Sequence, residues 1–130
     1  MFKRIDHVVI AVKDLEETAS LYTKTYGLKQ TEPEEIPALG IRRVNIDVGN
    51  AYIELAQPTD PNGPIAKFLA DRGEGLYLIA VTVDDLPGAV KQLQERGARL
   101  IGAENASKPA GGQVFIHPKS AHGALIMLSQ

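Results

Sequence analysis

Two stretches of the sequence resemble each other: "IDHVVIAVKDL" at residues 5–15 and "GLYLIAVTVDDL" at residues 75–86. Val12-Lys13-Asp14-Leu15 aligns with Val83-Asp84-Asp85-Leu86 at an offset of 71 residues. Each stretch passes from a β-branched apolar run to an aspartate that can cap a helix. An internal repeat of this kind indicates two copies of one supersecondary unit that bury apolar surface together.

The composition is that of a globular protein and excludes several classes of function. The chain has 130 residues, of which 44% are apolar and 23% charged, which suits one domain with a real core. A net charge of −2 and 5% aromatic residues argue against nucleic-acid binding. The absence of cysteine excludes disulfides, thiolate metal sites and cysteine nucleophiles. No apolar run approaches the ~18 residues of a membrane span, and a strand-like segment begins by Ile5, so we expect no signal peptide and a cytoplasmic location.

Each copy of the repeat has the same order of predicted elements: strand, helix, strand, strand, strand. In the first copy we expect strands at 5–12, 27–31, 41–48 and 51–56, a helix from 15 to 26, and a loop or irregular edge at 32–39. In the second copy we expect strands at 76–83, 98–101, 113–117 and 124–128, a helix from 86 to 96, and a loop at 103–112.

The predicted fold class is α+β. One domain, 1–130, would contain two βαβββ modules, about 1–58 and 74–130, joined by a linker with a short helix at 64–72. Two small curved sheets side by side would leave a central cleft, and ligand pockets favour such interfaces.

A second correspondence, at an offset of 73, aligns Ile53-Glu54-Leu55 with Ile126-Met127-Leu128. The repeat therefore pairs Glu54 with Met127 and His7 with Leu78. His7 and Glu54 stand in apolar strands, where a carboxylate is costly unless it is paired or faces a cleft. They are the candidate catalytic residues, and a hydrogen-bonded pair without catalytic function remains the alternative.

Several motifs carry a resemblance to a known family. "DHVVIAVKDL", "GNAYIELAQP", "PIAKFLADRGEGL" and "GGQVFIHPKSAHGALIML" together resemble the vicinal oxygen chelate (glyoxalase/bleomycin resistance/dioxygenase) superfamily, and most closely its methylmalonyl-CoA epimerase branch. The resemblance covers nearly the whole chain. It implies two βαβββ modules, a dimer, and a divalent metal ion in the cleft.

The resemblance also implies which residues hold the metal. Two of the four expected ligands are similar to His7 and Glu54, whereas the other two positions are occupied by Leu78 and Met127. The catalytic carboxylate expected shortly before a Gly-Val pair would fall near Pro37 and Ala38, where the chain has no acid. This chain therefore differs from the family pattern at two of the four metal-ligand positions and at the acid–base groups.

These substitutions change the expected chemistry. The epimerase reaction removes the proton next to a thioester carbonyl, and the metal stabilises the resulting enolate. One imidazole and one carboxylate are too few donors for a stable hard-cation site, and a thioether suits softer metals. We therefore expect no metal cofactor, with His7 and Glu54 as remnant ligands. A divalent ion would need replacement ligands from elsewhere, for which the chain offers His117, His122, Glu34 and Glu35.

Other residues are candidates for ligand binding. Tyr77 and Leu78 stand where the family has two adjacent histidines, and Met127 would line the same cleft, although core packing explains Tyr77 equally well. His117, Lys119 and Ser120 would contact a ligand's phosphates, as the resemblance implies, or form an ordinary polar loop. Gly111-Gly112 would let the backbone approach that ligand, or serve a turn.

Three functional hypotheses follow. The first is an enzyme, an isomerase or lyase acting on a small carbonyl or acyl-thioester compound by acid–base chemistry without the usual metal. The second is a metal-free small-molecule binding protein of the bleomycin-resistance type. The third is a metal-dependent epimerase with replacement ligands. The partner would be a small molecule, a CoA thioester among the possibilities, and the chain would form a homodimer without nucleic-acid or membrane partners.

Overall fold

The structure, a computed structural model, describes residues 1–108 and 112–130. The chain divides into two compact units. His7–Tyr77 form what we call the N-terminal unit, and Leu78–Gln130 together with Met1–Asp6 form the C-terminal unit. The predicted single domain with modules of about 1–58 and 74–130 stays a prediction. Within the described residues, no helix has the length and apolarity needed to cross a membrane.

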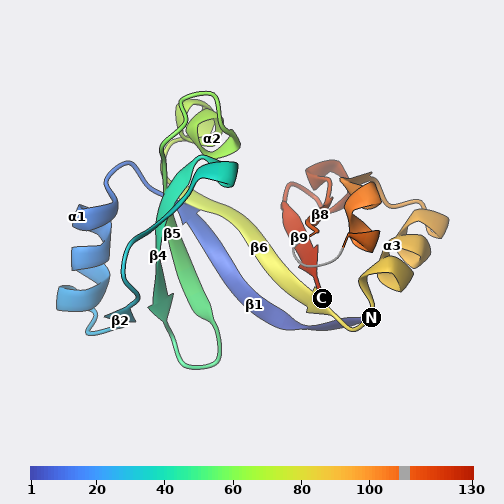
Figure 1. Cartoon of the computed structure of the whole chain (residues 1–130), viewed down its shortest axis with the longest axis horizontal. Helices are drawn as coiled ribbons and strands as arrows, with labels where there is room; N and C mark the ends of the chain where they lie inside the picture. Colours follow the sequence, from blue (N-terminus) through green and yellow to red (C-terminus); the bar gives the residue numbers. More distant parts are fainter. Residues whose placement is uncertain (109–111) are drawn as a thin grey trace. The chain divides into compact units, whose positions relative to one another are not determined.

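The N-terminal unit combines a mostly antiparallel sheet with two helices. Its elements are β1 (Phe2–Ala11, whose first residues belong to the C-terminal unit), α1 (Leu15–Ser20), β2 (Lys29–Gln30), β3 (Glu34–Ile36), β4 (Ile41–Asp47), β5 (Tyr52–Pro58) and α2 (Pro64–Arg72). The strand order is β2-β4-β5-β1, with β3 also paired to β4, and β1 and β5 run parallel. Figure 1 shows α1 beside β4 and β5, which it contacts.

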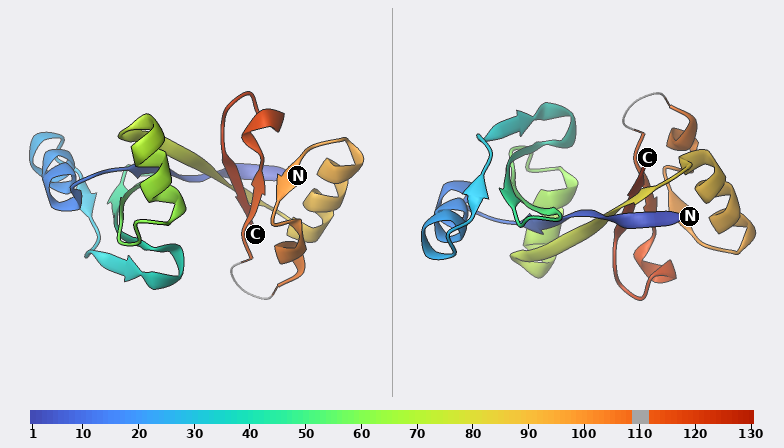
Figure 2. Two further views of the ribbon diagram at one scale, coloured as in Figure 1. Left: turned by 90° about the horizontal axis from the view of Figure 1, so that it is seen from above. Right: turned by 90° about the horizontal axis from the view of Figure 1, so that it is seen from below.

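The C-terminal unit repeats this arrangement. Its elements are β6 (Gly75–Val83, whose first residues belong to the N-terminal unit), α3 (Leu86–Glu95), β7 (Leu100–Ile101), β8 (Val114–Ile116) and β9 (Ile126–Ser129), with 3-10 turns at Ala103–Ser107 and Pro118–Ser120. The strand order is β7-β8-β9-β6, with β6 and β9 parallel. Helix α3 and the turn at Ala103–Ser107 lie on the same side of β8 and β9 (Figure 2). The α+β fold with two βαβββ repeats is thus confirmed.

The strand register reproduces the two sequence offsets. In the parallel pair of β1 and β5, Val9 lies opposite Glu54. In the parallel pair of β6 and β9, Ala80 lies opposite Met127. Ala80 is 71 residues after Val9, and Met127 is 73 residues after Glu54, so the two pairs are equivalent positions of one repeated unit.

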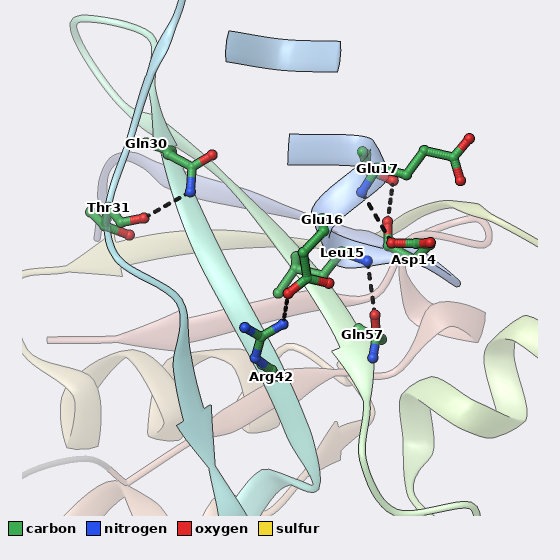
Figure 3. Close-up of polar contacts among 9 residues, drawn as sticks. Asp14, Leu15, Glu16, Glu17, Gln30, Thr31, Arg42 and Gln57 are labelled. Carbon is green, nitrogen blue, oxygen red and sulfur yellow. Dashed lines mark hydrogen bonds and ion pairs between the residues drawn. The ribbon is translucent and has the colours of Figure 1, made fainter. Parts of the chain in front are cut away.

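The helix starts are repeated as well. The Asp14 carboxylate accepts a hydrogen bond from the Glu17 N–H at 3.0 Å, and Asp85 accepts one from Gly88 at 3.2 Å. The first N–H of each helix donates to a glutamine side chain that lies in the last strand of its own repeat or directly after it. Leu15 donates to Gln57, drawn in Figure 3, and Leu86 donates to Gln130, both at 2.8 Å. These side chains satisfy N–H groups that a helix cannot satisfy itself.

Each helix covers one face of its own sheet. In the N-terminal unit this core comprises Val12, Leu15, Ala19, Val44, Ile46 and Leu55. In the C-terminal unit it comprises Val81, Val83, Leu86, Ala89, Val90, Val114, Ile116 and Leu128. Because side chains alternate along a strand, the residues between these core positions point to the opposite face. That face carries Glu54 in the first repeat and Met127 in the second.

The strands expected at 27–31 and 98–101 are shorter, Lys29–Gln30 and Leu100–Ile101, and two further segments differ in kind. The predicted loop or irregular edge at 32–39 contains the short strand β3, because Glu34–Ile36 stands between two prolines and pairs antiparallel with β4. The predicted helix to residue 26 changes at Leu21 into a π-helical turn that ends at Thr25. There the Thr23 hydroxyl donates to the Ala19 carbonyl at 2.9 Å, a side-chain bond that competes with regular helix pairing.

Candidate functional site

His7 and Glu54 lie on the face of the N-terminal sheet that α1 leaves uncovered. His7 lies opposite Tyr52 in the β1–β5 pair, and Glu54 follows two residues later on β5. The His7 and Tyr52 rings stack with centroids 4.5 Å apart and an interplanar angle of 11°. His7 is 8% exposed and Glu54 5%, so both polar side chains are buried.

Glu54 is neutralised by an arginine from the neighbouring strand. Arg43 Nη1 donates to Glu54 Oε1 at 2.9 Å, across the hairpin of β4 and β5. In this hairpin Asn45 lies opposite Glu54 and Arg43 opposite Ala56, so Arg43 reaches Glu54 diagonally. A charge-assisted hydrogen bond of this kind compensates much of the free energy lost when a carboxylate leaves water.

A second carboxylate holds the same guanidinium more loosely. Glu34 on β3 lies opposite Arg43 in the β3–β4 pair, and its Oε2 is 3.5 Å from Arg43 Nη2. Burial alone would lower the pKa of Arg43, but the negative charges of Glu54 and Glu34 outweigh this and raise it above the usual value. Arg43 is therefore a permanent cation between a buried and an exposed carboxylate.

Two polar atoms of this face lack a hydrogen-bond partner within the described residues. They are Arg43 Nε, a donor, and Asn45 Oδ1, an acceptor, and both are buried. The two residues are two positions apart on β4 and thus share a face. Buried polar atoms are usually satisfied, so unpartnered ones on the same face as His7 mark a place where a ligand or water can bind.

The donors of this site do not fit the divalent metal ion that the resemblance implies. No group of three or more His, Cys, Asp or Glu side chains suited to a metal occurs in residues 1–108 and 112–130. Arg43 Nη1 already bonds one oxygen of the Glu54 carboxylate, and its positive charge disfavours a cation at the other oxygen. Of the replacement ligands considered, Glu34 lies against the same guanidinium, and Glu35 lies opposite Arg42 on β4.

The equivalent face of the C-terminal unit is apolar. Leu78 is buried, and Met127 lies opposite Ala80, on the side of the sheet away from α3. Thr82 lies two residues beyond Ala80, and its buried hydroxyl has no partner within the described residues. The second repeat therefore offers hydrocarbon and a thioether where the resemblance implies a histidine and a glutamate.

The predicted phosphate-binding residues His117 and Ser120 take part in the internal bonding of their own turn. The Lys119 N–H donates to His117 Nδ1 at 3.0 Å, and the Arg99 N–H donates to the Ser120 hydroxyl at 2.9 Å. Desolvation, and then the charges of Arg99 and Lys119, lower the pKa of His117. Lys119 is exposed. The close approach suggested for Gly111-Gly112 involves Gly111, which lies outside the described residues.

Tyr77 packs against a helix. Its ring meets Phe68 of α2 edge to face, with centroids 5.2 Å apart, and burial raises the pKa of its phenol. Tyr77 belongs with His7 and Glu54 to the N-terminal unit, whereas His117, Lys119, Ser120, Leu78 and Met127 belong to the C-terminal unit.

The sequence reasoning missed Arg43, Asn45 and Tyr52. A usable signal was present, because a two-residue turn at Gly49-Asn50 fixes the register of the flanking strands. The structure has this turn, with the Val48 N–H bonded to the Ala51 carbonyl at 3.1 Å. Counting outward from it pairs Asn45 with Glu54 and places Arg43 one diagonal step away.

Comparison with known proteins gives a consistent family. The Glyoxalase/Bleomycin resistance protein/Dioxygenase superfamily matches residues 6–116. The ethylmalonyl-CoA/methylmalonyl-CoA epimerase of Cereibacter sphaeroides is 37% identical over 100% of this chain and 99% of its own length. The mitochondrial methylmalonyl-CoA epimerase of Homo sapiens is 35% identical over 98% of this chain and 73% of its own length.

Solved structures agree. A single-residue variant of Streptomyces coelicolor methylmalonyl-CoA epimerase, in complex with 2-nitronate-propionyl-CoA, superposes with a TM-score of 0.86 at 31% identity, covering 98% of this chain and 96% of that one. With both repeats, their register and nearly the full length accounted for, the chain belongs to the glyoxalase/bleomycin resistance protein/dioxygenase superfamily, as a methylmalonyl-CoA epimerase-like member.

Proposed function

We propose that this protein is an enzyme that moves the α-proton of a small acyl-CoA thioester. The observation that carries the proposal is the 37% identity to an ethylmalonyl-CoA/methylmalonyl-CoA epimerase over the whole of this chain. A solved neighbour, 32% identical, is a methylmalonyl-CoA epimerase in complex with methylmalonyl-CoA. Removal of this weakly acidic proton leaves negative charge on the thioester oxygen, which a catalyst must stabilise.

His7 is the proposed base. Histidine is the most frequent general base of enzymes, and His7 is the histidine of the N-terminal unit. It takes the proton from the α-carbon while the electron pair of that bond moves toward the thioester oxygen. Solvent delivers a proton to the opposite face of the resulting enolate, which inverts the centre, and His7 passes the proton it took back to water.

Glu54 has a different role in this proposal. Its carboxylate oxygen accepts from Arg43 at 2.9 Å, so the residue anchors a cation on the same face as His7. We propose that the reaction needs no divalent metal ion, because the guanidinium N–H groups that Glu54 leaves unused can take the place of a metal in binding the oxygen atoms of the ligand. The choice between His7 and Glu54 as base thus falls on His7.

The proposed partner is a CoA thioester, and the proposed assembly is a homodimer. Exposed apolar side chains at the start of β1 support association, since Phe2 is 48% exposed and Ile5 54%. Light scattering on a size-exclusion column measures the molar mass. A mass of one chain at micromolar concentration would refute the dimer.

One observation favours a metal-free binding protein as the second candidate. With Glu54 engaged by Arg43, His7 is left as the proton carrier of this face, whereas inversion needs proton delivery from both sides. In that case the protein would bind an acyl-CoA or a similar small anion without changing it.

Solvent deuterium exchange separates the two candidates. Methylmalonyl-CoA is incubated with the protein in D2O, and the signal of its α-proton is followed by NMR. We expect exchange by the natural protein and a decrease of about 10²- to 10⁴-fold in His7→Asn. The matched control is His122→Asn, an exposed histidine of the C-terminal unit, which should exchange at the natural rate. If neither methylmalonyl-CoA nor any other acyl-CoA takes up deuterium, the binding protein is the correct alternative.

A further inference from the structure

We propose that Arg43 binds the free carboxylate of an acyl-CoA whose acyl group is a dicarboxylic acid of the malonyl type. The CoA part of this statement rests on the proposed function, whereas the carboxylate part rests on the contacts of Arg43 itself. The residue would be both the fixed cation of the site and the group that distinguishes a malonyl-type acyl group from a plain one.

One edge of the guanidinium has a donor without a hydrogen-bond partner in the described residues. Its Nη1 is held by buried Glu54 at 2.9 Å, which fixes the orientation of the plane. Its Nε is buried and has no partner in the described part of the chain. Nε and Nη2 form one side of the planar group, and that side matches the two oxygens of a carboxylate.

Glu34 is the group that a ligand would replace. Its contact with Nη2 is long, 3.5 Å, and its side chain is 61% exposed, so it returns to water easily. An ion pair of that kind contributes little to stability. Exchanging the Glu34 carboxylate for a ligand carboxylate leaves the net charge around Arg43 unchanged, so the site gains no uncompensated buried charge.

Asn45 gives a second polar contact on the same face. It lies opposite Glu54 and two residues from Arg43, and its amide oxygen is buried without a partner in the described residues. The side-chain amide of Asn45 can rotate to present either its oxygen or its NH2 group. It can therefore accept a hydrogen bond from, or donate one to, a polar group of the ligand that lies next to the carboxylate.

The neighbouring arginine shows what a purely structural ion pair looks like here. Arg42 points to the opposite face of β4, where it pairs with Glu16 of α1 (Figure 3). The Glu16 side chain is 63% exposed, and Arg42 contacts neither Glu54 nor Asn45. Arg42→Gln therefore removes one positive charge from the same strand without touching the proposed site.

The test compares two CoA esters that differ by one carboxylate. Calorimetric titration, with a chelator and at constant ionic strength, measures the affinities for malonyl-CoA and acetyl-CoA. The natural protein should bind malonyl-CoA about 10- to 100-fold more tightly, the range expected for a charge-assisted bidentate contact. The ratio of the malonyl-CoA affinity to the acetyl-CoA affinity should fall close to one in Arg43→Gln and stay unchanged in Arg42→Gln. It should be partly retained in Arg43→Lys, because lysine keeps the charge but lacks the paired N–H donors of a guanidinium.

A ratio that survives in folded Arg43→Gln overturns the proposal. Glu34→Gln provides a test that does not disturb the buried pair. Removal of the competing carboxylate should strengthen malonyl-CoA binding and leave acetyl-CoA binding unchanged, and an unchanged or weakened affinity for malonyl-CoA contradicts the proposal. If the protein exchanges the α-proton for deuterium but the affinity ratio does not depend on Arg43, this inference is wrong and the proposed function stands. If the affinity ratio depends on Arg43 but no deuterium is taken up, the enzymatic function is wrong and the carboxylate site stands.

Discussion

Arg43 and Glu54 are the residues on which the site of the N-terminal unit depends. The Glu54 side chain is 7% exposed, and its ion-pair partner Arg43 is 26% exposed. The two partners are therefore unequal: loss of the arginine leaves a buried anion, whereas loss of the glutamate leaves a cation that still reaches Glu34. Removing one partner of a buried ion pair lowers the stability of a protein far more than replacing both partners by apolar residues.

Arg43→Met should destabilise the protein by about 2–4 kcal/mol, because Glu54 then stays buried without its counter-charge. The double replacement Arg43→Met with Glu54→Leu should recover most of that loss, since two apolar groups need no pairing. Urea unfolding followed by circular dichroism measures both. Additive effects of the two substitutions would show that the pair is not coupled.

His117 should make the stability of the C-terminal unit depend on pH. Its pKa is lowered in the folded state, by desolvation and by the charges of Arg99 and Lys119, so the folded protein disfavours the protonated ring. This contribution is complete above the unfolded pKa and is lost as the pH falls through the folded value. Protonation also removes the acceptor Nδ1 that holds the Lys119 N–H.

The melting temperature should therefore fall between pH 7 and pH 5, and His117→Asn should reduce this fall, because asparagine can cap the turn without titrating. Scanning calorimetry at several pH values checks it. His122→Asn, the exposed histidine, is the control. If both variants show the natural slope, His117 does not carry the effect.

Part of the site could be predicted residue by residue and part could not. The repeat offsets pair His7 with Leu78 and Glu54 with Met127 from the sequence alone. The register places Glu54 opposite Val9 and Met127 opposite Ala80, as the offsets require, whereas the functional roles of these residues stay predictions. Arg43 was missed because its importance comes from a neighbour on another strand, which the alternation within β4 does not show.

At the scale of elements, the two repeats use one device to begin their helices. Gln57 and Gln130 are equivalent residues, and each accepts the first helical N–H of its repeat at 2.8 Å. Both bonds are partly buried and tie the last strand of a repeat to its helix.

Gln57→Ala and Gln130→Ala should each cost about 1 kcal/mol in the free energy of unfolding, because each leaves one partly buried N–H unsatisfied. Chemical denaturation of both single variants checks the size and the similarity of the two losses. Gln94→Ala, an exposed position on α3, is the control and should lie within about 0.5 kcal/mol of the natural protein. Losses no larger than that of the control would show that these bonds are not stabilising.

Element predictions succeeded where local chemistry is strong. The helix at 64–72 has the predicted bounds, since Pro64 opens it and Gly73 adopts a positive φ of 77° after it. The end of α1 and the strand β3 were missed. The π-helical turn contains a hydrogen bond from the Thr23 hydroxyl to the Ala19 carbonyl, and β3 pairs with β4 on a separate segment, so neither follows from the periodicity of its own segment.

At the scale of the whole molecule, the repeat explains the fold and also the change in chemistry. Both copies keep the register, the helix caps and a helix-covered core, which any descendant of a duplicated unit needs in order to fold. The positions that differ, His7 against Leu78 and Glu54 against Met127, lie on the face away from the helix. The scaffold was thus predictable from the pattern, whereas the contacts of that face were not.

Divalent cobalt or manganese should leave the melting temperature unchanged, because a ligand stabilises a protein only when it binds the folded state. A metal at 100 times its dissociation constant would add about 2.7 kcal/mol, which thermal unfolding detects easily. A rise in the melting temperature that saturates with metal concentration and disappears when a chelator is added would contradict this prediction. It would show that the donors of the described residues suffice to bind a divalent metal ion.

The most direct measurement is proton exchange in the absence of divalent ions. The natural protein is treated with a chelator, and deuterium uptake at the α-carbon of methylmalonyl-CoA is followed by NMR, with and without added cobalt. We predict that exchange proceeds after chelation, that its rate does not rise with cobalt, and that Arg43→Gln slows it whereas Arg42→Gln does not. Exchange that stops after chelation and returns with cobalt would contradict a site in which an arginine provides the positive charge.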